Sequence, residues 1–339
     1  MCTSQSGYVY HSGRPLLTKE ELSIPEPKGS EIVLKVRAAG LCSSDVHVLN
    51  SSLPLTYPNS FAMGHEIAGE IYKLGPNVDA DKYSIGDGYA VHGLNSCGDC
   101  SFCKVGSQNL CTDNNSTWYG LGKNGGYEQY VLVKSVHDLI KIPEGVSFSE
   151  AAVASDAVLT PYHAISTCNL KATSKVLVIG CGGLGTCALQ IIKLYSAYVV
   201  CVDSKAELEE LAKEYGADEF YTDLSKSSVP KMSFDCVFDF VAIQPTFTIS
   251  QNYVKSGGII KPVGLGAPSL TFSLLDLGCR DVKIIGSFWG TQAEQKDCME
   301  LIQRGLVKPL ITSFTFDEFP QAYELLSTGK SKGRLVISQ

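Results

Sequence analysis

Four cysteines lie close together in one segment of the chain, in the pattern Cys97-x2-Cys100-x2-Cys103-x7-Cys111. Four thiolates at such spacing are typical of tetrahedral Zn²⁺ sites. Because all four coordination positions are taken by cysteine, none is left for a reacting molecule, and we predict a structural zinc. The spacing does not match that of ferredoxin clusters. The residues alone leave two alternatives open, a pair of local disulfides or free thiols.

A glycine-rich turn predicts dinucleotide binding. Gly180, Gly182 and Gly185 follow the apolar run 176–179 and open a helical pattern. Such glycines permit a tight turn and let the backbone approach a pyrophosphate at a helix N-terminus. Asp203 ends the next apolar run, where a carboxylate hydrogen-bonds ribose hydroxyls and repels a 2′-phosphate, so NAD(H) is favoured over NADP(H). The alternative is a glycine turn that only packs a helix.

Three further residues are candidate ligands of a second metal. Cys42 follows the first clear strand pattern of the chain, His65 comes 23 residues later in Gly64-His65-Glu66, and Asp156 lies among small apolar residues. A lone cysteine or histidine is more often an ordinary core residue than a ligand. A carboxylate in an apolar segment is costly to bury unless it is paired or bound to a metal.

Composition excludes several classes of protein. The chain has 339 residues, a net charge of −7, 44% hydrophobic and 19% charged residues, which predicts a soluble globular protein of two domains. An acidic chain without basic runs is a poor nucleic-acid or membrane binder, and no apolar run is long enough to span a bilayer. The first six residues contain no apolar signal core, so we expect a cytoplasmic protein. The 13 cysteines, an odd number, exclude a fully paired disulfide framework.

The elements that must position these residues fall into two groups. Residues 31–37 alternate apolar and polar side chains, and frequent glycine and proline residues indicate short strands and turns in the first half. From residue 175 onward, strands alternate with helices, which predicts a parallel sheet. We expect strands over 176–179, 198–202, 234–241, 258–263 and 282–288, and helices over 182–195 and 205–215. Further helices are expected over 293–304 and 319–327, and a last strand over 334–337.

Together these motifs resemble the zinc-dependent medium-chain alcohol dehydrogenases. The resemblance rests on residues 40–45, Gly64-His65-Glu66, the four-cysteine loop, the glycine turn and Gly333-Arg334, in the family's order. Segments 154–164, 264–268 and 287–291 resemble the yeast carbonyl reductase, or secondary-alcohol dehydrogenase, branch. The family implies an α/β protein with a GroES-like β-rich catalytic domain (1–156 and 291–339) and a Rossmann coenzyme domain, a doubly wound parallel sheet (157–290).

The resemblance implies two zinc ions per subunit. Cys42, His65 and Asp156 match the ligands of the catalytic zinc, and many relatives have a second cysteine in place of Asp156. Glu66 matches a residue beside the zinc that transiently replaces its water. Asp45 matches a carboxylate that orients the zinc-bound histidine.

The resemblance also implies a cofactor site and a proton path. Thr160 matches a residue near the nicotinamide, Arg334 one on the pyrophosphate, and Val263 a further cofactor contact. The glycine turn supplies the remainder of that site, namely Gly180, Gly182, Gly183, Leu184 and Gly185. Ser44 is predicted to take the alcohol proton and to pass it through the nicotinamide ribose to His47. The alternatives are a helix N-cap and a surface histidine.

The substrate pocket is less well defined. Phe61, Trp118, Tyr119 and Leu121 lie in segments that flank the cleft in relatives, although each is equally compatible with a core position. Trp289 is a candidate for the pocket or for a contact between subunits. The resemblance implies reversible hydride transfer between NAD(H) and secondary alcohols and ketones, with primary alcohols and aldehydes as further substrates. The alternatives are a polyol dehydrogenase of the sorbitol or xylitol type and a non-catalytic NAD-binding protein. We expect a homodimer, with a tetramer as the alternative.

Overall fold

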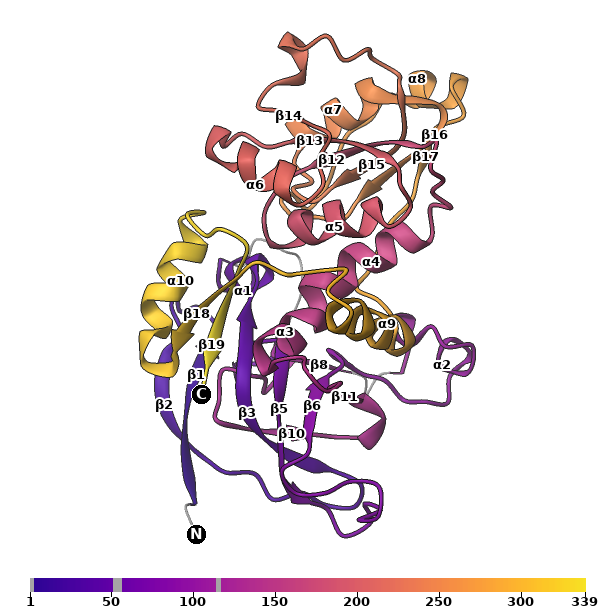
Figure 1. The fold of residues 1–339 in the computed structure, drawn as a ribbon. Coiled ribbons are helices and arrows are strands. Elements are labelled where there is room, and N and C mark those ends of the chain that lie inside the picture. The colour runs from indigo at the N-terminus through magenta and orange to yellow at the C-terminus, as the bar shows by residue number, and fades with distance from the viewer. Residues whose placement is uncertain (1–2, 51–56, 114–116) are drawn as a thin grey trace. The chain divides into compact units, whose positions relative to one another are not determined.

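The computed structural model describes residues 3–50, 57–113 and 117–339 (Figure 1). The chain forms two compact units. The first comprises Met1–Leu159, Gly290–Arg304 and Ile311–Gln339, and the second Thr160–Trp289 and Gly305–Leu310. The sequence placed the boundaries after residues 156 and 290. The structure moves each by a few residues and groups residues 305–310, expected in the catalytic domain, with the second unit.

The first unit is rich in β structure. Its largest sheet has the order β11-β6-β5-β3-β19-β18, with β10 also paired to β3. The strands of this sheet are β3 (Ile32–Leu41), β5 (Glu66–Leu74), β6 (Gly88–Val91), β10 (Tyr130–Val133), β11 (Leu139–Lys141), β18 (Ile311–Thr315) and β19 (Arg334–Ser338). Two smaller sheets contain β1 (Ser4–His11), β2 (Thr18–Ser23) and β4 (Ser60–Ala62), and β7 (Leu94–Asn95), β8 (Thr117–Tyr119) and β9 (Gly122–Lys123).

Strand register brings segments distant in sequence to one end of this sheet. Gly40, near the end of β3, pairs with Glu66 at the start of β5 and with Val336 in the middle of β19, and the next residue, Leu41, pairs with Leu335. The C-terminal strand therefore lies beside the strand that leads into Cys42 (Figure 1). Because these pairs are antiparallel, the end of β3 meets the beginnings of β5 and β19.

Short helices cover the sheets of the first unit. They are α1 (Ser43–Leu49), α2 (Ser101–Lys104), α3 (Phe148–Val153), α9 (Gln292–Gln303) and α10 (Phe319–Ser327), with the 3-10 turns η1 (Gln108–Leu110), η2 (Val136–Asp138) and η6 (Phe316–Glu318). After α3 the chain widens into the π-helical segment η3 (Ala154–Val158), which contains Asp156. Such π-helical insertions occur frequently at functional sites.

The second unit contains a parallel sheet of the order β14-β13-β12-β15-β16-β17 in its described residues. Its strands are β12 (Lys175–Ile179), β13 (Tyr198–Val202), β14 (Glu219–Tyr221), β15 (Phe234–Asp239), β16 (Val254–Pro262) and β17 (Lys283–Ile284). Numbered along the chain, the strand order is 3-2-1-4-5-6, which is that of a doubly wound dinucleotide-binding sheet. The chain first adds strands on one side of β12 and then, from β15 onward, on the other side. The expected α/β fold class is confirmed.

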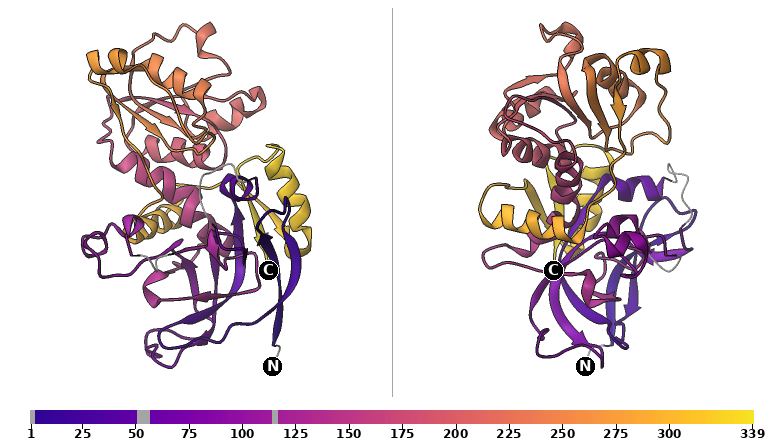
Figure 2. Two further views of the ribbon diagram at one scale, coloured as in Figure 1. Left: turned by 180° about the vertical axis from the view of Figure 1, so that it is seen from behind. Right: turned by 90° about the vertical axis from the view of Figure 1, so that its right-hand side faces the viewer.

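Helices lie on both faces of this sheet, as Figure 2 shows. They are α4 (Leu159–Ser166), α5 (Gly183–Lys193), α6 (Glu209–Glu214), α7 (Gln244–Tyr253) and α8 (Leu274–Cys279), with the 3-10 turns η4 (Ala206–Leu208) and η5 (Leu224–Lys226). Buried aliphatic and aromatic side chains of the strands form the core beneath them. The central strands β12 and β13 are buried on both faces over all but their first residue, which explains their uninterrupted apolar sequences.

Several expected elements differ in extent from those observed. The helix expected over 205–215 is a 3-10 turn followed by the shorter α6. The strand expected over 282–288 is only β17, because Lys283 and Ile284 lie at the edge of the sheet and pair on one side. Across the described ranges, no helix is both long and apolar enough to cross a membrane.

Candidate metal centres and dinucleotide turn

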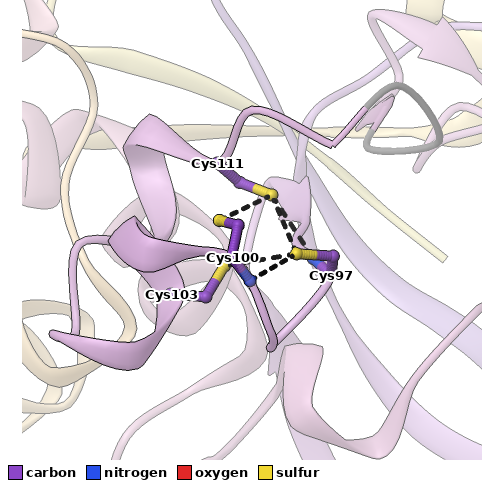
Figure 3. A group of neighbouring side chains, drawn as sticks. All are labelled: Cys97, Cys100, Cys103 and Cys111. Carbon is purple, nitrogen blue, oxygen red and sulfur yellow. Dashed lines mark hydrogen bonds between the residues drawn. The ribbon is translucent and has the colours of Figure 1, made fainter.

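The four cysteines of the predicted structural site converge in space (Figure 3). The Sγ atoms of Cys97 and Cys103 are 3.9 Å apart, as are those of Cys100 and Cys111, and those of Cys111 and Cys97 are 3.5 Å apart. A zinc bound at about 2.3 Å by four thiolates would place the sulfur atoms about 3.8 Å from one another. A disulfide bond requires about 2.05 Å. The arrangement therefore fits a tetrahedral metal and not paired disulfides.

Electrostatics within the cysteine group also favour a cation. Hydrogen bonds from the backbone of Cys103 and Thr112 lower the pKa of the Cys100 thiol to about 6. Burial, together with the neighbouring thiols, raises the pKa of Cys103 to about 12. Cys100 thus ionises readily, whereas burial and hydrogen bonds with neighbouring thiols hold the proton on Cys103, which a divalent cation would displace.

A second group of ligand atoms forms at the sheet end described above. Cys42, His65, Glu66 and Asp156 are all buried, and their ligand atoms lie within 4.8 Å of one another. Cys42 is the N-cap residue of α1, His65 immediately precedes β5, and Asp156 comes from η3. The structure thus brings together the three predicted zinc ligands and Glu66.

The histidine has a distinct neighbour on each ring nitrogen. Nε2 of His65 lies 3.7 Å from Oδ2 of Asp156, and Nδ1 lies 3.3 Å from Oδ1 of Asp45. A metal-bound histidine usually has a carboxylate beside its other ring nitrogen, as Asp45 is placed here. Although burial alone would lower the pKa of His65, the negative charge of Asp45 raises it well above its usual value. The site therefore favours positive charge, as a metal-binding site must.

Arg334 contributes an unexpected contact. Its guanidinium is buried and lies 2.6 Å from both Oε1 of Glu66 and Oδ2 of Asp156. Burial by itself would raise the pKa of Asp156, but the His65 hydrogen bond and the Arg334 charge hold it below its usual range. Burial raises the pKa of Glu66 well above its usual value. The sequence placed Arg334 on the cofactor pyrophosphate; that role stays a prediction, and the structure adds a contact with the metal group.

The two predicted proton-transfer residues lie on α1. Oγ of Ser44 is 3.6 Å from Sγ of Cys42, so this hydroxyl adjoins the ligand group. His47 is three residues further along the same helix, and burial lowers its pKa. Residues separated by three positions share a helix face. Both roles remain predictions, with geometry that is compatible with them.

The predicted cofactor residues, apart from Arg334, belong to the second unit. Gly180 follows β12, and Gly182 is the N-cap of α5 without a side-chain cap. A Cβ on Gly185 would lie 1.9 Å from the carbonyl oxygen of Gly180, whereas one on Gly182 would meet no atom within 4 Å. The third glycine is therefore required for packing, and the second leaves open space beside the helix N-terminus.

Asp203 is tied to this turn. Its Oδ2 accepts a hydrogen bond from the backbone N–H of Cys181 at 2.8 Å, and its Oδ1 one from Lys205 N at 3.0 Å. Val263 follows β16, and its N–H donates to the carbonyl of Asp239 at 2.8 Å. The glycine turn, Asp203 and Val263 thus lie beyond the carboxyl ends of parallel strands, where such sheets bind nucleotides. Thr160 lies in α4 at the start of the unit, and its role near the nicotinamide stays a prediction.

The predicted pocket residues are dispersed. Phe61 is buried in β4, Trp118 lies in β8 paired with Leu94, and Leu121 packs against the core of the first unit. Trp289 belongs to the second unit and adopts a left-handed backbone conformation with φ of 53°.

Two tyrosines near the ligand group were missed by the sequence analysis. Tyr57 lies within electrostatic range of His65 and Asp45, and its ring is 6.2 Å from that of Phe61. The hydroxyl of Tyr127 is 2.6 Å from Oδ2 of Asp45. The only sequence signal for Tyr127 is the preceding pair of glycines, which indicates a close backbone approach.

Comparisons with known proteins agree with this description. Residues 28–144 match the alcohol dehydrogenase GroES-like domain, and residues 183–304 match the zinc-binding dehydrogenase domain. The NAD-dependent alcohol dehydrogenase of Sulfurisphaera tokodaii is 34% identical over 96% of this chain and 97% of its own length. The alcohol dehydrogenase of Geobacillus stearothermophilus is 28% identical over 97% of each chain.

A solved structure shows the same fold over the full length. The acetophenone reductase of Geotrichum candidum, determined in complex with NAD, is 42% identical with a TM-score of 0.95, covering 100% of this chain and 98% of its own. The fold, the two ligand groups and these matches define a zinc-type oxidoreductase. The chain belongs to the zinc-binding medium-chain alcohol dehydrogenase family, whose cofactors are zinc and NAD(H).

Proposed function

We propose that this chain catalyses the reversible, NAD(H)-dependent interconversion of secondary alcohols and ketones, with primary alcohols and aldehydes as further substrates. The observation that carries the proposal is the buried group of Cys42, His65 and Asp156. Three protein ligands with a remaining open position are characteristic of a catalytic zinc site. The likeness to an acetophenone reductase favours ketones as the substrate class.

Each group would have a separate task. A zinc ion held by Cys42, His65 and Asp156 would polarise the substrate oxygen and lower the pKa of an alcohol. Ser44, beside Cys42, would accept the alcohol proton, and His47 would pass it to solvent. Because burial lowers the pKa of His47, its imidazole is neutral near pH 7 and able to accept a proton. NAD bound at the 180–185 turn would accept the hydride.

The side chains near the ligand group support an apolar substrate. Tyr10, Tyr57 and Phe61 form a connected aromatic group, with ring centroids 5.1–6.4 Å apart. Tyr57 also lies within electrostatic range of His65. An aromatic wall favours aryl or alkyl ketones, whereas a polyol requires several hydrogen-bonding side chains. Trp118 and Leu121 of the first unit, and Trp289 of the second, stay candidate substrate contacts in this proposal on the sequence resemblance alone.

Turnover of two substrates distinguishes the candidate functions. We expect NADH-dependent reduction of acetophenone to be much faster than NAD-dependent oxidation of sorbitol at equal concentration. A preference for sorbitol would favour the polyol dehydrogenase. Loss of both activities, together with well under two zinc ions per chain, would favour a non-catalytic NAD-binding protein.

We also propose that the protein is a homodimer. The edge strand β17 is exposed, and large apolar side chains near it are exposed as well, namely Leu274, Leu275, Ile285 and Phe288. An open strand edge beside apolar side chains is a favourable site for pairing between identical copies. Light scattering after size exclusion tests this, and a monomer at micromolar concentration would contradict it.

The thiols of both metal sites favour a reducing compartment, so we propose a cytoplasmic location. Fractionation of cells that produce the full chain would test this, with recovery in an oxidising compartment as the contradictory result.

A further inference from the structure

Tyr127 lies at the centre of the buried ligand group although it offers no metal ligand. It is 1% exposed, and its hydroxyl donates to Oδ2 of Asp45 at 2.6 Å. The carbonyl oxygen of Gly40 is 3.2 Å from the same hydroxyl, a longer distance. Because a phenol has one hydrogen to donate, its principal acceptor is the carboxylate of Asp45.

Asp45 in turn contacts two of the three zinc ligands, Cys42 and His65. Its Oδ2 accepts the backbone N–H of Cys42 at 2.9 Å and so caps α1, while Oδ1 faces Nδ1 of His65 at 3.3 Å. A shift of this carboxylate would therefore change the position of two ligands at once. Tyr127 supplies the one side-chain hydroxyl that the structure describes on Oδ2.

The backbone of Tyr127 and its neighbour Gly126 contacts the segment just before His65 directly. Its N–H donates to the carbonyl of Met63 at 2.9 Å, and the N–H of Gly126 donates to the carbonyl of Gly64 at 2.7 Å. These residues immediately precede His65. Tyr127 thus links the segment before His65, through its main chain, to the segment around Cys42, through its side chain.

The hydroxyl is kept protonated by its surroundings. Burial, and then the negative charge of Asp45, raises the pKa of Tyr127 well above its usual value. The hydroxyl is therefore protonated, and able to donate a hydrogen bond, near neutral pH.

We infer that Tyr127 is a positioning residue of the zinc site: through its hydrogen bond to Asp45 it fixes His65 and Cys42 in the geometry that holds the metal. This rests on the proposed function, since it presupposes a zinc ion on these ligands. Partners one step removed from a metal typically change its affinity by about 10–100-fold.

The competing explanation is that Tyr127 only fills the core. Its ring covers Gly64, where a Cβ would lie 2.5 Å from it, and meets Phe319 at 4.8 Å between centroids. Phenylalanine would keep these ring contacts and lose only the hydroxyl. Tyr127→Phe therefore separates positioning from packing.

The test measures the rate of zinc loss to a chelator and the affinity of zinc binding, both on the full protein. A Cys42→Ser variant should bind zinc only at the four-cysteine site. Its zinc loss therefore shows which part of the wild-type release comes from that site. For Tyr127→Phe we expect about 10–100-fold weaker retention of the other zinc and unchanged retention by the four cysteines. Cobalt substitution should show an altered visible spectrum, because the ligand geometry changes.

Tyr253→Phe is the matched control. This buried tyrosine donates to the carbonyl of Leu224 at 2.8 Å in the second unit, and its loss should leave zinc retention as in the wild type. Equal zinc retention by Tyr127→Phe and the wild type would overturn the inference and leave the proposed function intact. A wild type that binds no zinc at Cys42 would overturn the proposed function itself.

A double-mutant cycle provides a readout if Tyr127→Phe is also less stable. In an Asp45→Asn background, the hydroxyl has lost its charged acceptor, so Tyr127→Phe should cause little further loss of zinc affinity. Additive losses would indicate a general structural effect and would contradict the inference.

Discussion

Arg334 and Asp156 form a buried ion pair, with Nη2 of the guanidinium 2.6 Å from Oδ2 of the carboxylate, although 178 positions separate them in sequence. The same guanidinium lies 2.6 Å from Glu66. The first residue of β19 thus places a positive charge beside two acidic residues of the ligand group. Antiparallel pairing of β19 with β3 places Arg334 there, since Leu335 is opposite Leu41.

Arg334→Leu should destabilise the protein, because it leaves two buried carboxylates without this cation. Removing one partner of a buried ion pair costs about 3–5 kcal/mol. Urea unfolding of the metal-free protein measures the loss. Arg334→Lys, which keeps the charge, should lose less, and a leucine variant as stable as the wild type would contradict the assignment.

Cys100→Ser should lower thermal stability before it affects turnover. The loop around the cysteines contains few core-forming side chains, so the metal must organise it. Calorimetry of the zinc-loaded protein provides the melting temperature. Cys279→Ser, at an exposed thiol outside both ligand groups, is the control and should leave it unchanged. The prediction fails if both variants melt alike.

Asp203→Gly should relax the preference for NAD(H). The carboxylate that would repel a 2′-phosphate is removed, and so is the acceptor of the Cys181 N–H. The ratio of kcat/KM values for NADPH and NADH should rise. Asp203→Asn removes the charge and keeps an acceptor, so it separates repulsion from turn geometry. An unchanged ratio in both variants would exclude Asp203 from cofactor selection.

Glu128 should make stability depend on pH. Burial raises its pKa to about 8, and its Oε2 accepts from Gln5 Nε2 at 3.2 Å and Asn124 Nδ2 at 3.1 Å. The folded state therefore holds a proton that the unfolded chain releases near pH 4.5. The contribution of Glu128 to the free energy of unfolding is therefore fully present below pH 4.5. It decreases by about 1.4 kcal/mol per pH unit up to about pH 8, where the folded state also loses the proton.

Glu128→Gln should remove this decrease, because the amide imitates the protonated acid and does not titrate. Urea unfolding of both proteins between pH 5 and 8 measures the difference. Parallel pH dependences would show that Glu128 is ionised in the folded state and would contradict this account.

Local patterns were sufficient to predict much of the fold. Val176-Leu177-Val178-Ile179 is continuous because β12 is buried on both faces, and the glycines at 180 and 185 are dictated by a left-handed backbone conformation and by a close backbone contact, respectively. The four cysteines were equally clear, since they lie on one loop. These features depend on neighbours in sequence.

Contacts set by strand register were not predictable in this way. The Arg334 ion pairs depend on how β19 aligns with β3, and the Tyr127 hydrogen bond on how residues 125–127 align with 63–64. The short β17 reflects its position at the sheet edge, which no local pattern encodes.

Asp156→Ala tests the central claim most directly, by comparing zinc content with turnover. We expect the wild type to bind two zinc ions per chain and to reduce acetophenone with NADH. The variant should fold, keep the zinc of the four cysteines, lose the other zinc and lose turnover. A folded variant with one zinc per chain and wild-type turnover would contradict the claim that Cys42, His65 and Asp156 hold the catalytic metal.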